Sequence, residues 1–433
     1  MIEKLDAVAR DAARKLAACN YVRVISHNDA DGITSAGIIC NALYRGGISF
    51  HTSIVSHLGE DVIKSLNDQM IVFCDMGSGQ PDLIAQLKGD VVVIDHHTPA
   101  TTDTKYVQVN PHLVGIDGAF ELSASGTTYA VAKHLGNNVD LAGLAIVGAI
   151  GDQQEMVSAN KDILDEAVKH NIITISHGLR IGDGDIADIL EYSIDPYLDI
   201  TGDPEKVHAF LNELNIHGNV SDLKPEELRR LASALALKVA KTSADAAESL
   251  VGERYELNRE VVRDAFQFRD LLNTSGKFKK ADLALSLCLR DGSAIDEAKQ
   301  LHSEYQKKVV SELKKVEKDI KEGESIRYAY SGDKDVSGAL VGSIIKYIAP
   351  DKPILVLTKH EGKTKISARA TKKLVEKGVD LSIAMREGAN QAGGTGGGHS
   401  VASGAAIPSG EEVKFIEAVD GIVTKQLGEA HEM

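Results

Sequence analysis

The chain has 433 residues, which is too long for one compact core and predicts two or three domains. Apolar residues make up 43% and charged residues 26%, as in an ordinary soluble globular protein. The net charge of −15 argues against a protein that coats nucleic acid by bulk electrostatic attraction. The four cysteines form no C-x-x-C pair, which argues against a zinc site or a disulfide framework. The sequence has no signal-peptide pattern and no bilayer-spanning apolar stretch, so we expect a cytoplasmic protein without membrane contact.

The first 195 residues have the pattern of an α/β domain. Short β-branched runs alternate with longer segments of helical periodicity, an order that indicates a parallel sheet covered by helices on both faces. A charged amphipathic helix precedes them over residues 1–20. The expected strands lie within residues 21–26, 50–56, 70–77, 90–97 and 105–110.

The remainder of the chain is expected to form three further parts. Residues 196–293 carry helical periodicity without a convincing strand and are interpreted as a helical insert. Residues 294–322 repeat apolar side chains every three or four positions until Gly323, which predicts one connecting helix of about 40 Å at 1.5 Å per residue. Residues 323–433 alternate strand-like and helical runs and predict a second, smaller α/β domain.

Acidic and imidazole side chains follow apolar strands or helices of the first domain where these elements end. Ligands bind beyond the carboxyl ends of the strands in open α/β sheets, so groups more than 120 residues apart can converge there. A dense acidic cluster needs cations, and oxygen and imidazole ligands without thiolate favour Mn²⁺ or Mg²⁺. A solvated loop or a buried histidine would explain any single group, so the combination carries the prediction. The groups are His27, Asp29 and Asp31; Asp75; Asp95, His96 and His97; and Asp152.

A glycine-rich segment and basic side chains mark the C-terminal domain. The segment "GGTGGGH", residues 393–399, is expected to be a loop that turns backbone N–H groups toward one phosphate. The window from Lys359 to Lys377 holds seven Lys or Arg and two Glu, and is the one sizeable positive window of this acidic chain. The stretch "SASGTT", residues 123–128, is expected to be a helix N-cap, with phosphate binding at the helix N-terminus as the alternative.

Several of these segments resemble a known family. The stretches "HNDADG", "CDMGSG", "DHH" and "GDQQ" resemble the four motifs of the DHH phosphoesterases, and "GGTGGGHSVASGAAIP" resembles the glycine-rich signature of the DHH-associated domain. Within that superfamily the sequence is most similar to the archaeal RecJ-like nucleases. The resemblance covers both outer domains and gives the insert little motif support. It implies an exonuclease of single-stranded DNA or RNA in DNA replication or repair, with the GINS replication complex as a partner.

The resemblance also implies roles for the site residues of the first domain. Two divalent cations, Mn²⁺ or Mg²⁺, would bind there with Asp75 as the bridge. Asp95 would orient His96, and His97 would face the phosphate. His27 stands where bacterial RecJ proteins have an aspartate. The implied metal ligands are His27, Asp29, Asp31, Asp75, His96 and Asp152, with Asp95 and His97 as catalytic residues.

The same resemblance implies a substrate-binding role for the C-terminal domain. Its glycine-rich loop and basic side chains would hold the backbone or terminal phosphate of the strand. The residues concerned are Lys363, Lys365, Arg369, Gly396, Gly397, Gly398 and His399.

Two metals that share a water would lower its pKa and stabilise the entering and departing oxygens of an attack on phosphorus. No side-chain nucleophile is then required. One alternative is a phosphodiesterase of short oligonucleotides, cyclic dinucleotides or 3′-phosphoadenosine phosphate, although the insert favours a polymer substrate. Another is a replication scaffold that binds without hydrolysis, although every motif acid is present.

Overall fold

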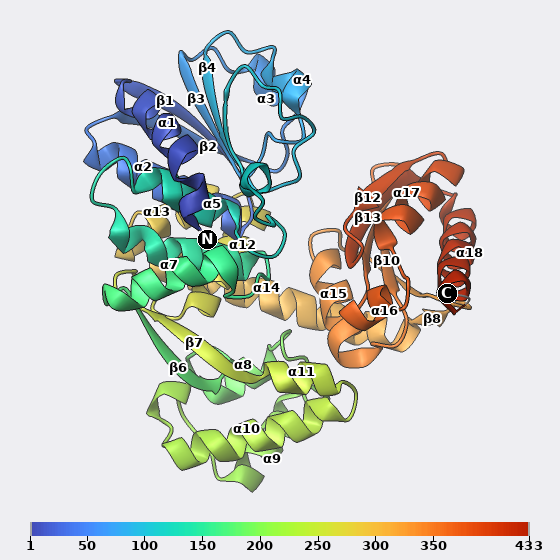
Figure 1. Ribbon diagram of the computed structural model, residues 1–433. Helices are drawn as coiled ribbons and strands as arrows, with labels where there is room; N and C mark the ends of the chain where they lie inside the picture. Colours follow the sequence, from blue (N-terminus) through green and yellow to red (C-terminus); the bar gives the residue numbers. More distant parts are fainter. Residues whose placement is uncertain (1, 432–433) are drawn as a thin grey trace. The chain divides into compact units, whose positions relative to one another are not determined.

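A five-stranded parallel sheet organises the first part of this computed structural model, which describes residues 2–431 (Figure 1). The strand order is β2-β1-β3-β4-β5. The chain places β2 on one side of β1 and the later strands on the other side, so the order reverses between β1 and β3. Every residue of β3 is buried, as expected for a central strand of a sheet covered on both faces. The predicted parallel α/β sheet is confirmed. Its strands are β1 (Tyr21–His27), β2 (Ser49–Val55), β3 (Met70–Cys74), β4 (Asp90–Ile94) and β5 (Val107–Val109).

Alternate strand residues point into two separate cores, because successive side chains of a strand leave opposite faces of the sheet. Val72 and Cys74 lie in the main core with residues of α1, α2, α5, α6 and α7. Ile71 and Phe73 lie in a smaller core beneath α3 and α4. The helices are α1 (Asp6–Ala17), α2 (Ala30–Arg45), α3 (Glu60–Lys64), α4 (Pro81–Ile84), α5 (Ala124–Ala132), α6 (Ala142–Gly151) and α7 (Ser158–Lys169).

Two helices from the middle of the chain complete the first compact unit, which comprises Met1–His177 and Glu253–His302. Helices α12 (Ala265–Lys277) and α13 (Ala281–Cys288) pack against α2, so the expected insert is divided between the first unit and the second. The second unit comprises Gly178–Gly252 and Ser303–Met433. Its share of the expected insert holds the helices α9 (Pro204–Leu214), α10 (Pro225–Ala240) and α11 (Ala244–Ser249). Helix α8 (Ile186–Glu191) precedes the expected insert but also belongs to the second unit.

The prediction that residues 196–293 hold no strand is wrong. Strand β7 (Val251–Leu257) pairs with β6 (Ile173–Leu179) in a two-stranded sheet. Much of β7 is exposed or half-buried, so it lacks the continuous apolar run by which the strands of the parallel sheet are recognised.

Helix α14 (Ile295–Val316) is shorter than the sequence predicts. The apolar spacing continues to Ile320, but that residue has extended backbone and leads into β8 (Lys321–Glu322), which pairs with β9 (Arg327–Ser331). Near the end of the helix, the Glu312 carboxylate accepts hydrogen bonds from the Gly332 N–H and the Ser331 hydroxyl. Strand pairing therefore ends a helix that periodicity alone would extend to Gly323.

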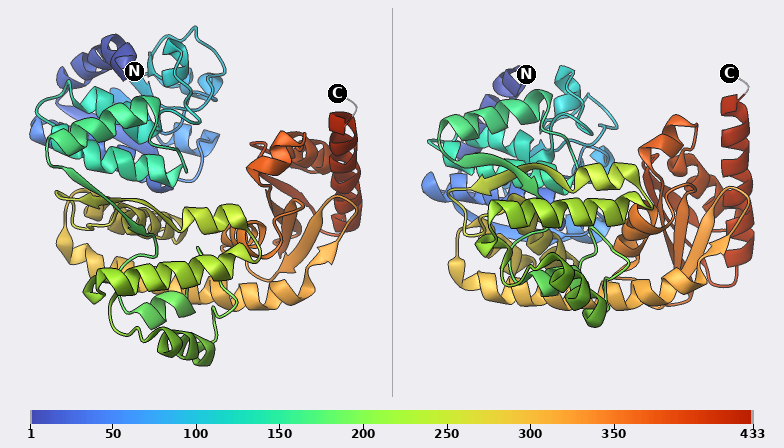
Figure 2. Two further views of the ribbon diagram at one scale, coloured as in Figure 1. Left: turned by 60° about the horizontal axis from the view of Figure 1, so that its bottom comes forward. Right: turned by 90° about the horizontal axis from the view of Figure 1, so that it is seen from below.

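A six-stranded mixed sheet organises the C-terminal part of the second unit (Figures 1 and 2). Its order is β12-β13-β11-β10-β9-β8, and only β9 and β10 pair in parallel. This confirms the predicted second α/β domain. The remaining strands are β10 (Ile354–His360), β11 (Lys363–Arg369), β12 (Thr395–Gly398) and β13 (Ala402–Pro408). The helices are α15 (Ser337–Ser343), α16 (Lys372–Glu376), α17 (Leu381–Gln391) and α18 (Glu412–His431), with a π-helical turn at Ile344–Ile348 after α15.

The two faces of this second sheet are covered differently. Helix α15 packs against β10 and β11, and α17 packs against β12 and β13. The Ser367 hydroxyl meets the Ser337 hydroxyl of α15, whereas a Cβ at Gly396 would meet the Met385 carbonyl of α17. The two helices therefore lie on opposite faces. Over residues 2–431, no helix has the length and the apolar character that crossing a bilayer requires.

Candidate metal centre

Acidic and imidazole side chains meet at the carboxyl edge of the first sheet. Asp29 and Asp31 follow β1, Asp75 follows β3 and His96 follows β4. The edge between β1 and β3 is where the strand order reverses, which is the ligand-binding position in open α/β sheets. Asp152 arrives from the C-terminal end of α6, and its Oδ2 lies 3.2 Å from His96 Nε2. The structure thus brings together residues from four distant segments of the chain.

Asp75 lies at the centre of this cluster. Its Oδ2 is 3.4 Å from His27 Nδ1, and its Oδ1 is 3.4 Å from His96 Nε2 and 3.9 Å from His97 Nδ1. The side chain is buried, and Oδ1 makes no hydrogen bond. The backbone φ of 57° is in the left-handed region, which a non-glycine residue adopts only where its surroundings hold it there. A buried, unsatisfied carboxylate oxygen among ligand groups fits a cation-binding position.

Asp29 connects the start of α2 to the cluster. Its Oδ1 accepts a hydrogen bond of 2.9 Å from the Gly32 N–H and so caps the helix. Its Oδ2 lies 2.8 Å from His27 Nδ1. Gly32 is required here, because a Cβ would lie 2.4 Å from the His27 carbonyl oxygen. Helix α2 therefore begins close enough to β1 for the Asp29 carboxylate both to cap the helix and to contact His27.

Asp31 is fully buried and is held by the first turn of α5. Its two carboxylate oxygens accept hydrogen bonds from the N–H groups of Ala124 and Ser125, at 2.7 and 2.9 Å. One of them, Oδ2, also lies 4.0 Å from His96 Nε2. The partial positive charge of a helix N-terminus stabilises this carboxylate and fixes its direction.

This contact decides between the two interpretations of residues 123–128. Ser123 is the N-cap of α5, and its side chain accepts a hydrogen bond from the Gly126 N–H, so the N-cap prediction is confirmed. The alternative, phosphate bound at this helix N-terminus, is wrong because the Asp31 carboxylate occupies these donors.

The three residues Asp95, His96 and His97 divide their roles differently from the prediction. The His96 ring donates from Nδ1 to the Gly118 carbonyl at 2.7 Å, which leaves Nε2 as the ligand atom facing the carboxylates. Asp95 Oδ1 instead contacts His97 Nδ1 at 2.8 Å, and its Oδ2 accepts from the Ser78 N–H. Asp95 therefore contacts His96 through the backbone, where its Oδ1 accepts from the His96 N–H at 2.8 Å, whereas the Gly118 carbonyl holds the ring.

Burial and charge shift the titration of the cluster strongly. Burial alone would lower the pKa of His27, but hydrogen bonds to Asp29 and Asp75 raise it to about 11. Asp75 is buried too, yet the imidazoles of His27 and His96, each 3.4 Å from one of its oxygens, hold its pKa below the ordinary range. Burial and the Asp75 charge raise the pKa of Asp31 to about 6, and burial with the Asp31 charge raises the pKa of Asp152 well above its ordinary value. In the absence of cations, bound protons therefore offset part of the negative charge of the cluster.

The acidic and imidazole groups form overlapping sets that could hold metal ions. Asp75 and His96 each belong to two sets of potential ligands, so one site can share a bridging carboxylate with the next. Oxygen and imidazole donors without thiolate suit Mn²⁺ or Mg²⁺. Within each set the ligand atoms lie within 4.8 Å of one another, and the sets are His27, Asp29 and Asp75; Asp75, His96 and His97; and Asp31, His96 and Asp152.

The predicted basic residues of the second unit share one face of the second sheet. Lys363, Lys365, Ser367 and Arg369 alternate along β11 and point to the α15 side, and both lysines are exposed. The Arg369 guanidinium donates to the Ala368 carbonyl, and it has no ion-pair partner among residues 2–431. A half-buried cation without a paired carboxylate is a suitable phosphate contact.

The glycine-rich segment is an edge strand, not the loop that the sequence predicts. Strand β12 pairs with β13, so the N–H groups on that side are committed to the sheet. A Cβ would come within 2.4 Å of a carbonyl of α17 at Gly396 and within 2.6 Å of the Ala402 carbonyl at Gly398, but would meet nothing within 4 Å at Gly397. His399 lies exposed in the turn to β13. Gly396 and Gly398 therefore allow close approach of neighbouring backbone, whereas Gly397 leaves open space on the α15 side of the sheet.

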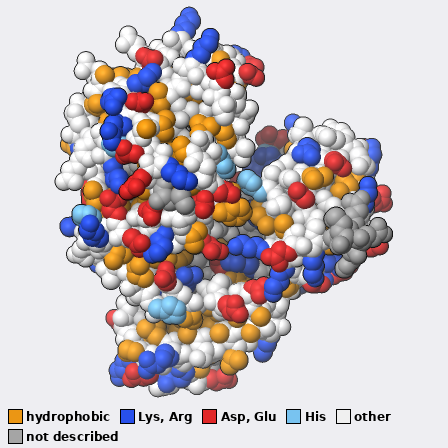
Figure 3. Space-filling view, in the orientation of Figure 1, with side chains coloured by type: hydrophobic (Ala, Val, Ile, Leu, Met, Phe, Trp, Pro, Cys, Tyr) orange, Lys and Arg blue, Asp and Glu red, His pale blue; other side chains and the backbone are white. Residues whose placement is uncertain are grey.

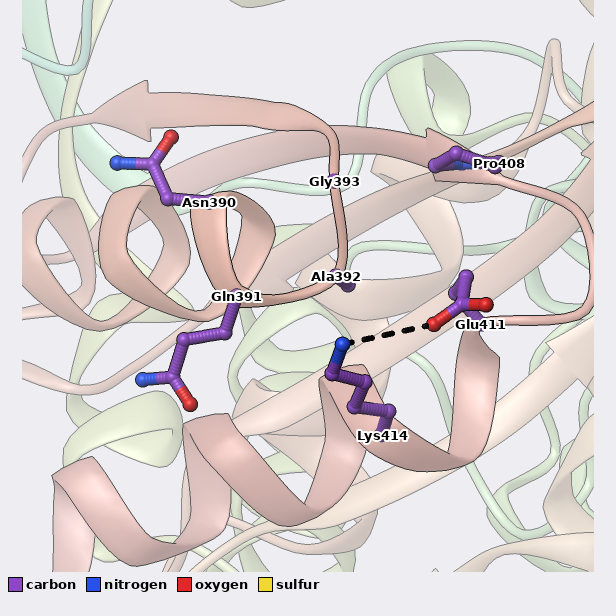
Figure 4. Close-up of a pocket in the computed structure, with 7 residues that line it drawn as sticks. All are labelled: Asn390, Gln391, Ala392, Gly393, Pro408, Glu411 and Lys414. Atoms are coloured by element: carbon purple, nitrogen blue, oxygen red, sulfur yellow. Dashed lines mark ion pairs between the residues drawn. The ribbon is translucent and has the colours of Figure 1, made fainter.

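Two surface features bear on where the chemistry lies. A pocket at the C-terminal end of α17 is lined by residues of which none is a predicted site residue, and its Lys414 pairs with Glu411 at 3.9 Å (Figure 4). In Figure 3, Lys and Arg side chains are interspersed with Asp and Glu side chains over the face shown. The pocket shares no residue with the acidic cluster. The pocket is lined by Asn390, Gln391, Ala392, Gly393, Pro408, Glu411 and Lys414.

Sequence reasoning missed the backbone groups that hold the ligands. The Gly118 carbonyl fixes the His96 ring, and the N–H groups of Ala124 and Ser125 fix Asp31. No residue type reveals such contacts, because every residue carries a carbonyl and nearly every one an N–H. The N-cap pattern that begins at Ser123 was the one available signal for the second contact.

The sequence matches two protein families in separate stretches. Residues 21–149 match the DHH family, N-terminal domain, and residues 324–425 match the DHHA1 domain. The chain is also similar to the uncharacterized protein MJ0831 of Methanocaldococcus jannaschii, with 35% identity over 421 residues that cover 94% of each chain.

Several solved structures have a similar fold. RecJ of Thermus thermophilus in complex with Mn²⁺ has a TM-score of 0.65 at 17% identity, over 96% of this chain and 55% of RecJ. An exonuclease RecJ bound to manganese has a TM-score of 0.62 at 17% identity, over 96% and 94%. CDC45 of Entamoeba histolytica has a TM-score of 0.66 at 13% identity, over 98% of both chains. At these identities the likeness establishes the shared fold.

Proposed function

We propose that this chain, which belongs to the DHH family and carries both its N-terminal domain and a DHHA1 domain, is a metal-dependent phosphodiesterase that shortens single-stranded nucleic acid from an end. Two divalent cations, Mn²⁺ in the first place and Mg²⁺ as the second choice, would be its cofactors. The RecJ structures with bound manganese or magnesium support this choice by similarity of fold.

The unsatisfied Oδ1 atom of Asp75 is the observation that carries the proposal. This oxygen is buried, makes no hydrogen bond, and lies near His96 and His97, which form one ligand set with Asp75. The other carboxylate oxygen, Oδ2, lies 3.4 Å from His27 Nδ1, which belongs to a second set. A protein without a cation here would retain a buried acceptor without a hydrogen bond, on a residue with left-handed backbone, and both features cost free energy. A role of Asp75 as a cation ligand would account for both features.

The side chains around Asp75 have separate tasks in the proposed reaction. Cations held by the acids would activate a water and neutralise the charge that develops during attack on phosphorus. His97 is half-exposed, and hydrogen bonding to Asp95 raises its pKa although burial opposes this, so it can present a protonated ring to a phosphate oxygen. His96 keeps Nε2 as a ligand atom because Gly118 holds the opposite nitrogen.

The β11 face would bind the substrate backbone. Lys363, Lys365 and Arg369 supply positive charge on one face of β11, and the open space at Gly397 leaves room near the edge strand. Contacts to phosphates give affinity without reading the bases, which suits an enzyme that shortens strands of any sequence. His399, Gly396 and Gly398 complete the proposed binding segment.

End-labelled oligonucleotides test the proposal directly. The full chain is incubated with Mn²⁺ and with single strands of DNA and RNA labelled at the 5′ or the 3′ end, with the Asp75→Asn variant as the matched control. We expect nucleotide release from one end by the wild type and none by the variant. Absence of release from every strand by the wild type, at any Mn²⁺ concentration, would overturn the proposal.

Two alternatives are decided by further arms of the same assay. A phosphodiesterase of short oligonucleotides, cyclic dinucleotides or 3′-phosphoadenosine phosphate would cleave a dinucleotide faster than a long strand. A scaffold of the replication machinery would bind strands without hydrolysis. The GINS complex is the partner that we propose for a replication role, and a pull-down with purified GINS tests it.

A further inference from the structure

We propose that α12 positions the metal-binding segment between β1 and α2, with Asn273 and Gly276 as its positioning residues. This inference rests on the proposed metal centre and adds a part of the chain outside both family matches, which cover residues 21–149 and 324–425. The sequence pattern places this helix in a separate insert, but it belongs to the first compact unit.

The first contact satisfies a donor at the start of α2. The Asn273 Oδ1 atom accepts a hydrogen bond of 2.8 Å from the Ala30 N–H. The first N–H groups of a helix have no partner within the helix and need one from elsewhere. Asp29 Oδ1 already serves the Gly32 N–H, which leaves Asp29 Oδ2 directed at His27. Asn273 thus satisfies an N–H that the Asp29 cap leaves without a partner.

The second contact fixes the residue before Asp29. A Cβ at Gly276 would lie 1.7 Å from the Asn28 carbonyl oxygen, so only glycine permits this approach. The Asn28 side-chain amide donates in return to the Gly276 carbonyl at 3.3 Å. Segment 28–30 is therefore held by α12 at both of its ends, on either side of the ligand Asp29.

Helix α12 is itself held firmly. Phe268, Leu271 and Leu272 are buried in the main core, and the Thr274 hydroxyl meets His302 Nδ1 of α14 at 2.8 Å. The helix packs against α2, which begins just after Asp29, and against α6, which ends just before Asp152. One rigid element thus supports two of the segments from which cation ligands come.

Removing the acceptor of Asn273 while keeping its volume tests the first contact. We expect Asn273→Leu to weaken Mn²⁺ binding by about 10- to 100-fold, the usual loss when a group that orients a metal ligand is removed. Asn273→Asp keeps an acceptor oxygen and should restore binding to within a few-fold. Binding of Mn²⁺ to the full chain is measured by electron paramagnetic resonance, so the test does not depend on activity.

Amide hydrogen exchange of the metal-free proteins separates positioning from a general loss of stability. We expect Asn273→Leu to speed exchange across residues 28–33 and to leave the central strand β3 protected. If Asn273→Leu fails to fold, Asn273→Ala provides the same comparison. In the activity assay, kcat should fall while KM for the strand changes little.

A glycine pair tests the second contact. Gly276→Ala should displace segment 28–30 and weaken Mn²⁺ binding, whereas Gly292→Ala in the same unit meets no atom within 4 Å and should bind as the wild type does. Wild-type affinity in Asn273→Leu and Gly276→Ala, with unchanged exchange at residues 28–33, would overturn this inference alone. Failure of the wild type itself to bind Mn²⁺ would overturn the proposed function together with it.

Discussion

The carboxyl edge of the first sheet and the β11 face of the second sheet differ in how their functional groups are held. At the first, Asp31, Asp75, Asp95 and His96 are buried, and each is oriented by neighbouring groups. At the second, the charges of Lys363 and Lys365 stand exposed on an open strand. We infer that the first region is built before its ligands arrive, whereas the second adapts to what it binds.

This difference follows from what each region would recognise. Divalent cations need ligand atoms in fixed positions, and a small error in position costs much of the affinity. A nucleic-acid backbone needs positive charge at an approximate spacing, which long flexible side chains supply in solvent. Mutations should therefore have large effects at the first region and small, graded effects at the second.

The largest effect is expected for Asp75→Asn. Asparagine tolerates left-handed backbone, so the fold should be kept while the shared carboxylate is lost. Binding of Mn²⁺ and hydrolysis should both fall by at least about 100-fold, beyond the loss for a group that only supports a ligand. Calorimetric Mn²⁺ titration and the end-label assay measure this. Near-normal Mn²⁺ binding by the variant would remove Asp75 from the metal centre.

Changing the pH should shift Mn²⁺ affinity next most strongly. Hydrogen bonds overcome burial to raise the pKa of His27 to about 11, and burial raises that of Asp31 to about 6. Cations must displace these protons, so binding should tighten as pH rises, by up to about tenfold per pH unit for each proton released. The Asp31 proton ceases to compete above about pH 6, and the His27 proton competes throughout the neutral range. Titration in buffers of different ionisation enthalpy counts the released protons, and a pH-independent affinity would contradict the prediction.

A glycine comparison separates packing from substrate contact in the second unit. Gly396→Ala forces a Cβ to within 2.4 Å of the Met385 carbonyl, and should destabilise the fold by about 1–3 kcal/mol, as overpacking usually does. Gly421→Ala in α18 meets nothing within 4 Å and should leave the stability equal or slightly higher. Chemical denaturation measures both variants. Equal losses of stability in Gly396→Ala and Gly421→Ala would show that the close approach of α17 is not the cause of the loss.

The smallest effects are expected at the exposed lysines. Lys363→Ala and Lys365→Ala should each raise KM a few-fold, leave kcat unchanged, and reduce the slope of log affinity against log salt by about 1. Binding of a labelled single strand at several salt concentrations measures the slope. A loss of kcat with no change in salt dependence would place these residues in a role other than phosphate contact.

Most of the fold could be predicted from the strand and helix periods. The errors of that prediction have one cause. The parallel sheet and the second α/β domain are confirmed, because buried strands carry continuous apolar runs. The end of α14, the strand β7 and the membership of α12 in the first unit were missed. In each case a partner distant in the sequence decided the outcome, and local periodicity carries no record of that partner.

The sequence by itself determined which side chains gather at the carboxyl edge of the first sheet, because the positions after successive strands of a parallel sheet fall on one side. Only the tertiary structure decided how each is held: His96 by the Gly118 carbonyl, Asp31 by the first turn of α5, and Asp95 by the Ser78 N–H. The physical reason is that backbone donors and acceptors are common to all residues, so packing alone determines which of them point at a ligand.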